Sequence, residues 1–426
     1  MEKLTIIVLV CSFFNFAIAD SSDGIERLLE ASCKQNISLI QSILREGVNP
    51  NDFYNDNFPL NCAAVGTNPE AAIKAINILI KSGADPNLQN GYGQTALMSV
   101  VDHYWLWHPD VAQTLLNNGA KTDLQNRYGD TALMSAGWRP EAVEFLIKAG
   151  ASVDVQDKFG RTALMLFISN IRENEPEYSD SVDIIIKAKP NLELEQLAQH
   201  PYADKGERTA LDLAVIRSLP VVASKLLKAG AKVEGIGRSA LNVAANAIPN
   251  SIEVAGMLLK AGAQINFRDG NGNTPLINSI IRSVDQIEMS KFLIASGADL
   301  NLKNNQGNTA LIFATYYYHR GETILALLAA GANPNIQNQD NVTAIMGIRY
   351  QVDMLQKFVD SGASLDLQDR NGTTVLMINI YDLKSVNFCI TSGANLNLRN
   401  NEGHTALGLA RDQSVRDALI RAGGIE

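Results

Sequence analysis

Apolar residues recur in short runs along this chain, and a glycine followed by a polar stretch separates the runs. The unit is clearest at 297–311, where Gly-Ala, a segment rich in Asn and Asp, and Gly-Asn-Thr-Ala-Leu follow one another. The Thr opens a first apolar run, such as Ala-Leu-Met at 132–134. A second run, such as Ala-Val-Glu-Phe-Leu-Ile at 142–147, precedes the next glycine. This pattern predicts two short helices in each unit, each apolar on one side.

The unit repeats with a period of about 30 to 37 residues, apart from one longer step of about 47 residues between Thr162 and Thr209. A period in this range indicates a stacked array of similar units. The residue that opens the first helix is Thr or Ser in each copy: Thr95, Thr131, Thr162, Thr209, Ser239, Thr274, Thr309, Thr343, Thr374 and Thr405.

Each conserved part of the unit has a physical role. The Thr hydroxyl is expected to accept a hydrogen bond from a free N–H of the first helical turn. The glycine after the second helix is expected to adopt the left-handed conformation that ends a helix. The polar stretch that follows favours a tight turn. Because one unit cannot bury its own apolar face, neighbouring units must stack. The second helices are expected to end at Gly47, Gly83, Gly119, Gly150, Lys189, Gly230, Gly262, Gly297, Gly331, Gly362, Gly393 and Gly423.

These residues resemble the ankyrin repeat, whose first helix opens with Thr-Pro-Leu-His and whose second helix ends in Leu-Leu-x-x-Gly-Ala. Thr274-Pro275-Leu276 matches the opening, and 115–120 matches the end. The resemblance covers nearly all of the chain after residue 24. It implies an all-α solenoid of about twelve helix-turn-helix units with short β-hairpin turns. Most copies read Thr-Ala-Leu-Met, so the hydrogen bond that the family's His makes must be replaced or lost.

The resemblance also implies a function. Ankyrin-repeat proteins are predominantly scaffolds without enzymatic activity that bind a partner protein through their concave surface and hairpin tips. The leader and the Thr-Ala-Leu-Met copies look most like exported bacterial ankyrin proteins, which implies a periplasmic location. A secreted, extracellular effector that binds host proteins is the alternative.

Residues 1–19 have the pattern of a secretory signal peptide. Lys3 is followed by an apolar stretch at 4–16 and by Ala17-Ile18-Ala19 before Asp20. We expect cleavage after this leader and no membrane span in the mature protein, with an uncleaved anchor as the alternative. The expected division of the chain is a signal peptide (1–19), an N-terminal capping repeat (20–57), ankyrin repeats (58–161), an irregular repeat with enlarged loops (162–208), ankyrin repeats (209–404) and a C-terminal capping repeat (405–426).

Charge and residue chemistry exclude several functions. The net charge of −9 argues against nucleic acid as a partner, because phosphate binding needs clustered Lys and Arg. The five His residues have no Cys or carboxylate partner at metal-ligand spacing, and no catalytic set can be assembled. We therefore expect no metal, no cofactor and no enzymatic activity, and we expect a monomer. Cys33, Cys62 and Cys389 make no disulfide framework; we interpret Cys62 as a small buried hydrophobe, with a Cys33–Cys62 bridge as the open alternative.

Aromatic residues supply the candidate binding site. Tyr92, Tyr128 and Phe159 each precede the glycine of three consecutive hairpins, so their rings are expected to line up. Three rings in register favour a protein-binding hot spot, for which Tyr and Trp are typical. The other candidates lie in the turns between the two helices of a unit: Tyr104, Trp105, Trp107, Trp138 and, in a later unit, Tyr317. For the three Trp residues the alternatives are rings that pack on one another to cover the turns, or aromatic loops that bind a glycan or another small molecule.

Overall fold

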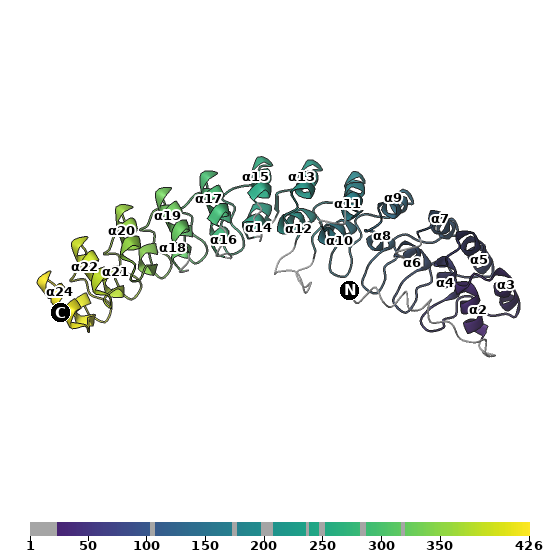
Figure 1. The fold of residues 1–426 in the computed structure, drawn as a ribbon, viewed down its shortest axis with the longest axis horizontal. Coiled ribbons are helices and arrows are strands. Elements are labelled where there is room, and N and C mark those ends of the chain that lie inside the picture. Colours follow the sequence, from purple (N-terminus) through teal and green to yellow (C-terminus); the bar gives the residue numbers. More distant parts are fainter. Residues whose placement is uncertain are drawn as a thin grey trace. The chain divides into compact units, whose positions relative to one another are not determined.

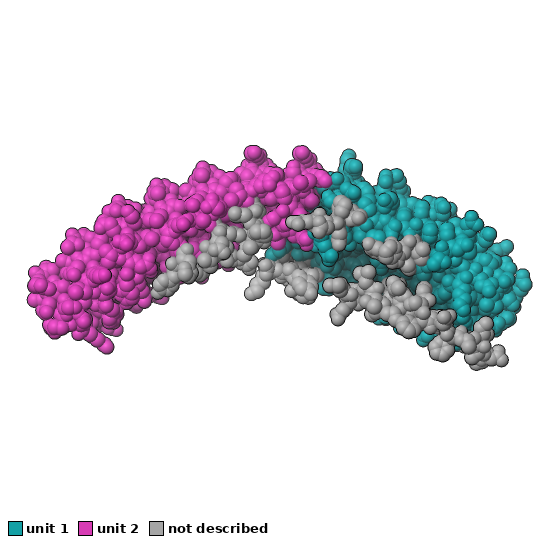
Figure 2. Space-filling view, viewed as in Figure 1, with its two compact units in different colours: residues 1–213 teal, residues 214–426 magenta. Residues whose placement is uncertain are grey.

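The computed structural model describes residues 24–102, 107–172, 177–196, 208–235, 238–246, 252–281, 287–316 and 320–426. The leader and parts of the enlarged loops within 162–208 lie outside these ranges. The chain divides into two compact units, residues 1–213 and 214–426, which Figure 2 colours separately. In both units the described residues form helix pairs joined by turns and hairpins.

The first unit stacks its helices in two rows, visible in Figure 1 as first helices packed on first helices and second helices on second helices. The helix α12 (Ala210–Ile216) contains the boundary between the units. The first helices are α2 (Gly24–Cys33), α4 (Pro59–Ala64), α6 (Ala96–Asp102), α8 (Ala132–Ser135) and α10 (Ala163–Asn170); the second helices are α3 (Ile37–Arg45), α5 (Pro69–Lys81), α7 (Pro109–Asn117), α9 (Pro140–Lys148) and α11 (Glu177–Lys187).

The second unit repeats this arrangement (Figure 1). Its strands β1 (Glu234–Gly235) and β2 (Arg238–Ser239) pair antiparallel, Glu234 with Ser239 and Gly235 with Arg238. The first helices are α14 (Ala240–Asn246), α16 (Pro275–Ile281), α18 (Ala310–Thr315), the 3-10 turn η1 (Ala344–Gly347), α21 (Val375–Ile378) and α23 (Ala406–Leu409); the second helices are α13 (Pro220–Lys228), α15 (Ile252–Lys260), α17 (Ile287–Ala295), α19 (Gly321–Ala329), α20 (Val352–Asp360), α22 (Leu383–Thr391) and α24 (Gln413–Arg421).

The core of each unit lies between the stacked helix pairs. In α5 the buried residues Ala72, Ala75, Ile76 and Leu79 recur at spacings of three and four, which places them on one side of the helix. This helix packs on α4 of its own pair and on the neighbouring second helices α3 and α7. The residues that recur as apolar in the sequence are therefore the ones that are buried between helices. The predicted all-α solenoid is confirmed.

The predicted Thr caps begin the first helices. The Thr309 hydroxyl accepts from the Ile312 N–H at 3.3 Å, and the equivalent bond at Thr405 to Gly408 is 3.2 Å. Such a cap contributes about 1 kcal/mol to helix stability. Thr343 is the exception, because its buried hydroxyl has no partner among the described residues and its helix is reduced to η1.

In several repeats the bond that the missing His would make is replaced by the side chain at the same position. Other repeats have Ile277, Ile312 or Gly408 there, and these residues have no side-chain acceptor. The Thr95 N–H donates to Sδ of Met98 at 3.5 Å, and Thr131 donates in the same way to Met134 at 3.4 Å. In α12 a carboxylate takes this place, since Asp212 accepts from both the N–H and the hydroxyl of Thr209 at 3.0 and 3.1 Å. A thioether is only a weak acceptor, so the Met copies retain the geometry with a weaker bond.

The expected helix-ending residues all have positive φ angles. The first, Gly47, has a φ of 89°, the last, Gly423, has a φ of 90°, and the non-glycine Lys189 has a φ of 57°. At Gly119, with φ of 89°, no atom lies within 4 Å of the position that a Cβ would occupy. The glycine is therefore required by the backbone conformation there and not by lack of space.

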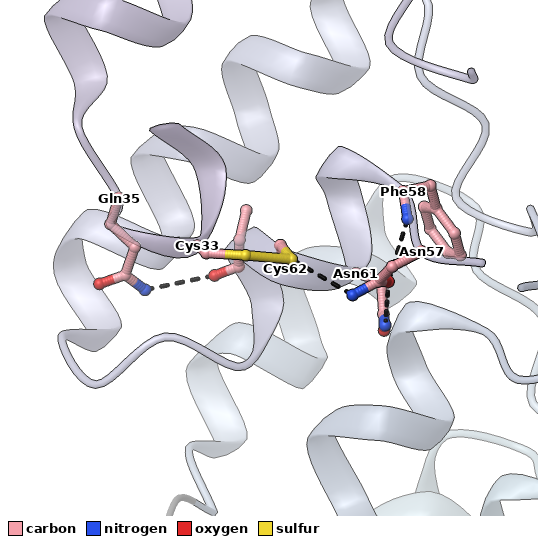
Figure 3. Close-up of a disulfide and its surroundings, with 7 residues drawn as sticks. Cys33, Gln35, Asn57, Phe58, Asn61 and Cys62 are labelled. Carbon is pink, nitrogen blue, oxygen red and sulfur yellow. Dashed lines mark hydrogen bonds between the residues drawn. A yellow bond between two sulfur atoms is a disulfide. The ribbon is translucent and has the colours of Figure 1, made fainter. Parts of the chain in front are cut away.

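One expectation for the cysteines is wrong. Cys33 at the end of α2 and Cys62 in α4 form a disulfide with their Cα atoms 4.5 Å apart (Figure 3). The two residues occupy different positions in their repeats, but α2 packs on α4 and brings the end of one helix beside the middle of the other. Gln35 Nε2 donates to the Ala63 carbonyl at 3.2 Å and ties the following turn to α4 (Figure 3). Cys62 is therefore a cross-link between the first two helix pairs, and not simply a buried hydrophobe.

Candidate functional site

The candidate site is the set of three hairpin tips in the first unit, each built on one Asn or Asp side chain. Asn90 Oδ1 accepts from the N–H groups of Tyr92 and Gln94, both at 2.9 Å. Asn126 and Asp157 make the same pair of bonds in the next two hairpins, at 2.8 to 2.9 Å. These local bonds close the turn, so the residue before the glycine stands at the tip.

Consecutive tips are joined by backbone hydrogen bonds. The Arg127 N–H donates to the Tyr92 carbonyl at 3.0 Å, and the Lys158 N–H donates to the Tyr128 carbonyl at 3.1 Å. Gly129 has φ of 86°, and a Cβ on it would lie 2.6 Å from the Lys158 nitrogen. A glycine is therefore needed here both for the turn and for the close approach of the next tip.

A row of glutamines holds the base of the same hairpins. Gln125 Nε2 donates to the Gly129 carbonyl of its own hairpin at 2.7 Å and to the Gln156 carbonyl of the next hairpin at 2.8 Å. Gln89 makes the equivalent bonds to Gly93 and Gln125, at 2.6 and 2.8 Å. We call this row, Gln89, Gln125 and Gln156, the glutamine rail. It fixes the spacing of the tips without using the tip side chains.

The tip side chains are exposed on this fixed backbone. Tyr92 is 54% exposed and Tyr128 is 50% exposed, whereas Phe159 is half-buried. The guanidinium of Arg161 lies 5.1 Å from the centre of the Phe159 ring and pairs with the buried carboxylate of Asp157 at 2.6 Å. The third ring is therefore supported from one side, while the first two residues are about half exposed to solvent.

The second unit has the same tip geometry with other side chains. The Arg370 N–H donates to the Asp340 carbonyl at 2.9 Å, and the Asn401 N–H donates to the Asn371 carbonyl at 2.9 Å. None of the residues that correspond to the three aromatic rings is aromatic: the sequence has Ile236 in the first hairpin of this unit, and polar residues follow at Asn271, Gln306, Asp340, Asn371 and Glu402. Aromatic tips are therefore a property of the first unit and not of the repeat.

The remaining candidate residues are separate from these tips. Trp107 packs edge to face on Phe145 of α9, with ring centres 5.4 Å apart. Trp138 lies under the guanidinium of Arg139, 4.2 Å from the ring centre. Both Trp residues are half-buried, Trp107 against the second helix of the next repeat and Trp138 against the neighbouring Arg139 of its own repeat. Tyr104, Trp105 and Tyr317 lie outside the described residues.

The glutamine rail and the basic residues beside the rings were not among the site residues expected from the sequence. The rail has a signal in the sequence, because an apolar residue, Gln and then Asn or Asp recur at 88–90, 124–126, 155–157, 336–338 and 367–369. The basic residues Arg127 and Lys158 directly precede two of the aromatic tips. Only the stacking of the hairpins makes these two positions neighbours.

No group of three or more His, Cys, Asp or Glu side chains in the described part of the chain is placed to hold a metal ion. No described helix is long and apolar enough to cross a membrane. Burial raises the pKa of the Cys389 thiol to about 12, which makes it a poor nucleophile.

Comparison with known protein families gives one match. The family described as ankyrin repeats (3 copies) matches residues 28–126, 70–157 and 241–338, which together make up more than half of the chain. No curated protein matches the chain.

Proposed function

Since the chain belongs to the ankyrin-repeat family, we propose that it is an exported binding scaffold whose first unit holds a partner protein on its aromatic hairpin tips. Ankyrin repeats suggest a protein-interaction scaffold, and proteins built from them are generally non-enzymatic. To this general function we add that the binding site lies on the aromatic tips of the first unit and that the protein is exported from the cytoplasm.

The observation that carries the proposal is the exposure of Tyr92 and Tyr128 on a rigid backbone. Rings held in place lose little conformational freedom on binding, which favours affinity. Tyr is also among the residues that dominate the binding energy of protein interfaces. The polar residues at the same positions in the second unit mean that the repeat itself does not require aromatic tips.

Two features support export. The first is the leader-like sequence of residues 1–19, with Lys3, the apolar stretch and Ala17-Ile18-Ala19. The second is the Cys33–Cys62 disulfide, since such bonds form and persist in oxidising compartments such as the bacterial periplasm and the extracellular space. We propose a periplasmic location, with a secreted protein as the alternative.

The test is site-specific photo-crosslinking in the producing cells. A photo-reactive phenylalanine analogue replaces Tyr92 or Tyr128 in one set of variants, and replaces Gln306 or Asn371 in a control set. We expect the first set to crosslink one partner protein and the control set to give none. Equal crosslinking from both sets would contradict a site on the first unit.

The affinity contribution of the rings is measured with the crosslinked partner. A folded Tyr92→Ala/Tyr128→Ala/Phe159→Ala variant should bind it at least about 30-fold more weakly, because hot-spot residues contribute about 2 kcal/mol or more. Circular dichroism checks that the variant remains helical. If the rings serve a glycan instead, a panel of glycans will quench Trp or Tyr fluorescence and the crosslinking set will yield no protein.

A further inference from the structure

We propose that the tips of the first unit bind an acidic segment of the partner, laid in extended form across Tyr92, Tyr128 and Phe159. This inference rests on the proposed function and names the chemistry of the partner surface. It is carried by two basic side chains beside the rings.

Arg127 and Lys158 stand at the same position in consecutive hairpins, directly before Tyr128 and Phe159. Both are exposed, and neither side chain makes a hydrogen bond or ion pair with any described residue. Their backbone N–H groups are fixed by the bonds to the preceding tips. The result is an alternating row of rings and unpaired cations, which we call the basic-aromatic row: Tyr92, Arg127, Tyr128, Lys158 and Phe159. The rings of Tyr92 and Tyr128 are exposed, and that of Phe159 is half-buried.

The second unit provides an internal comparison at the same repeat position. Arg370 also directly precedes a tip residue, but its guanidinium pairs with Asp340 of the preceding tip at 2.7 Å. Tyr92 and Tyr128 occupy the places that correspond to Asp340 beside Arg127 and Lys158. The cations of the first unit therefore lack the acid that the same position has in the second unit, and an acid from another molecule can take that place.

The acids around the row limit where the partner lies. Asp56 is exposed at the tip before Tyr92, and its carbonyl accepts from the Gly91 N–H at 3.4 Å. This carboxylate would repel an acidic segment, so the segment is placed from Tyr92 onward. Asp157 is buried and already paired with Arg161. The chain as a whole has a net charge of −9, which makes the row a local exception to the acidic surface.

The spacing of the row suits an extended chain. Packed helices lie about 8–10 Å apart, so stacked tips are separated by about the same distance. An extended segment in the polyproline II conformation has three residues per turn and rises about 3.1 Å per residue, so every third side chain lies on the same face at intervals of about 9 Å. Acidic side chains at every third residue of the partner segment would therefore meet Arg127 and Lys158 in turn, with the intervening apolar side chains placed beside the rings.

Two unpaired cations are few for a nucleic acid, whose affinity depends on the number of phosphates neutralised. An acidic peptide can bind with one carboxylate paired to the cation of each tip. We therefore assign the row to a protein segment, and single-stranded DNA serves as a competitor class in the test.

The test measures fluorescence anisotropy of a labelled peptide in which Glu recurs at every third residue with Phe between. We expect the wild-type protein to bind it, with affinity falling as NaCl rises from about 50 to about 300 mM because salt screens exposed charges. Arg127→Glu/Lys158→Glu should weaken binding about tenfold, since two attractive pairs become repulsive. Arg370→Glu is the matched control and should leave binding unchanged.

Several results would overturn the assignment. The first is that the Glu peptide does not bind, or that a peptide with Gln in place of Glu binds with the same affinity. The second is that Arg370→Glu weakens binding as much as Arg127→Glu/Lys158→Glu does. The third is that a single-stranded oligonucleotide binds more tightly than the Glu peptide. The proposed function fails separately, when positions 92 and 128 crosslink no protein. A partner that crosslinks there and is unaffected by the charge reversal would retain the scaffold function and remove only the acidic segment.

Discussion

Removal of the Cys33–Cys62 bond should weaken the N-terminal end of the first unit. The bond closes a loop of 29 residues. The chain-entropy relation for a loop of that length gives a loss of about 12 cal/mol/K in the unfolded state, or about 3.6 kcal/mol at 25 °C. Cys33→Ala/Cys62→Ala removes the bond without burying a new polar group, and reduction of the unmutated protein removes it without any substitution.

The loss should be local. In a stacked array each repeat is stabilised by its neighbours alone, and among the described residues the pair α2–α3 packs on a neighbouring pair on one side only. α2 packs on α3 and α4, and the disulfide adds the covalent tie to α4. We therefore expect amide exchange over 24–45 to speed up strongly on reduction, whereas exchange in α7 and α9 stays the same.

The assay is hydrogen exchange of oxidised and reduced protein, with Cys389→Ala as the control. Cys389 is buried and its thiol pKa is raised to about 12, so it should resist alkylation until the protein unfolds. When oxidised protein that lacks residues 1–19 is unfolded, an alkylating reagent should therefore modify only Cys389. Unchanged exchange over 24–45 after reduction would refute the reasoning, because the bond would then add nothing to the terminal pair.

Two further predictions concern hydrogen bonds. Gln125→Ala removes two rail bonds and should lower the free energy of unfolding, measured by urea denaturation, by about 1–2 kcal/mol. The control Gln113→Ala removes one exposed bond to Asn117 and should lower it by at most about 0.5 kcal/mol. Equal costs would show that the rail carries no special stability. Asp382 caps α22, and the Ser385 hydroxyl, followed by its N–H, holds the pKa of that carboxyl below 3.8. Its charged form thus stabilises the fold above the unfolded pKa, and this contribution is lost as the pH falls through the folded pKa. Asp382→Ala should cost about 1 kcal/mol near pH 7, and the difference from wild type should shrink in acid-unfolding curves below pH 3.8; a constant difference would exclude a role for the charge.

Features set by neighbouring residues could be predicted from the sequence. The Thr309 cap and the left-handed Gly119 each depend on atoms within one turn of the chain, so a local pattern is sufficient. The stacking of the tips at Tyr92 and Tyr128 followed from the repeat and is found in the structure. Their role in binding stays a prediction, because exposure shows that a side chain is available and not what it contacts.

Features that join different repeats could not be predicted in the same way. The disulfide links Cys33 and Cys62 across a helix contact between non-equivalent positions. The Gln125 side chain reaches a carbonyl 31 residues further along the chain. Such contacts depend on how far one pair is offset from the next, and a period alone does not fix that offset. The pairing of Arg370 with Asp340 depends on the same offset, whereas Arg127 has Tyr92 in the place that corresponds to Asp340.

The glutamine rail has a consequence for how this protein can change over time. The backbone bonds and the rail bonds described above join one hairpin to the next and are made without the rings of Tyr92 and Tyr128. Substitutions at the tips can therefore accumulate with little effect on folding, while Gly129 and Gln125 must stay. A gene of this kind can acquire a new specificity one hairpin at a time, and a library of variants randomised at the tips should consist mostly of folded proteins.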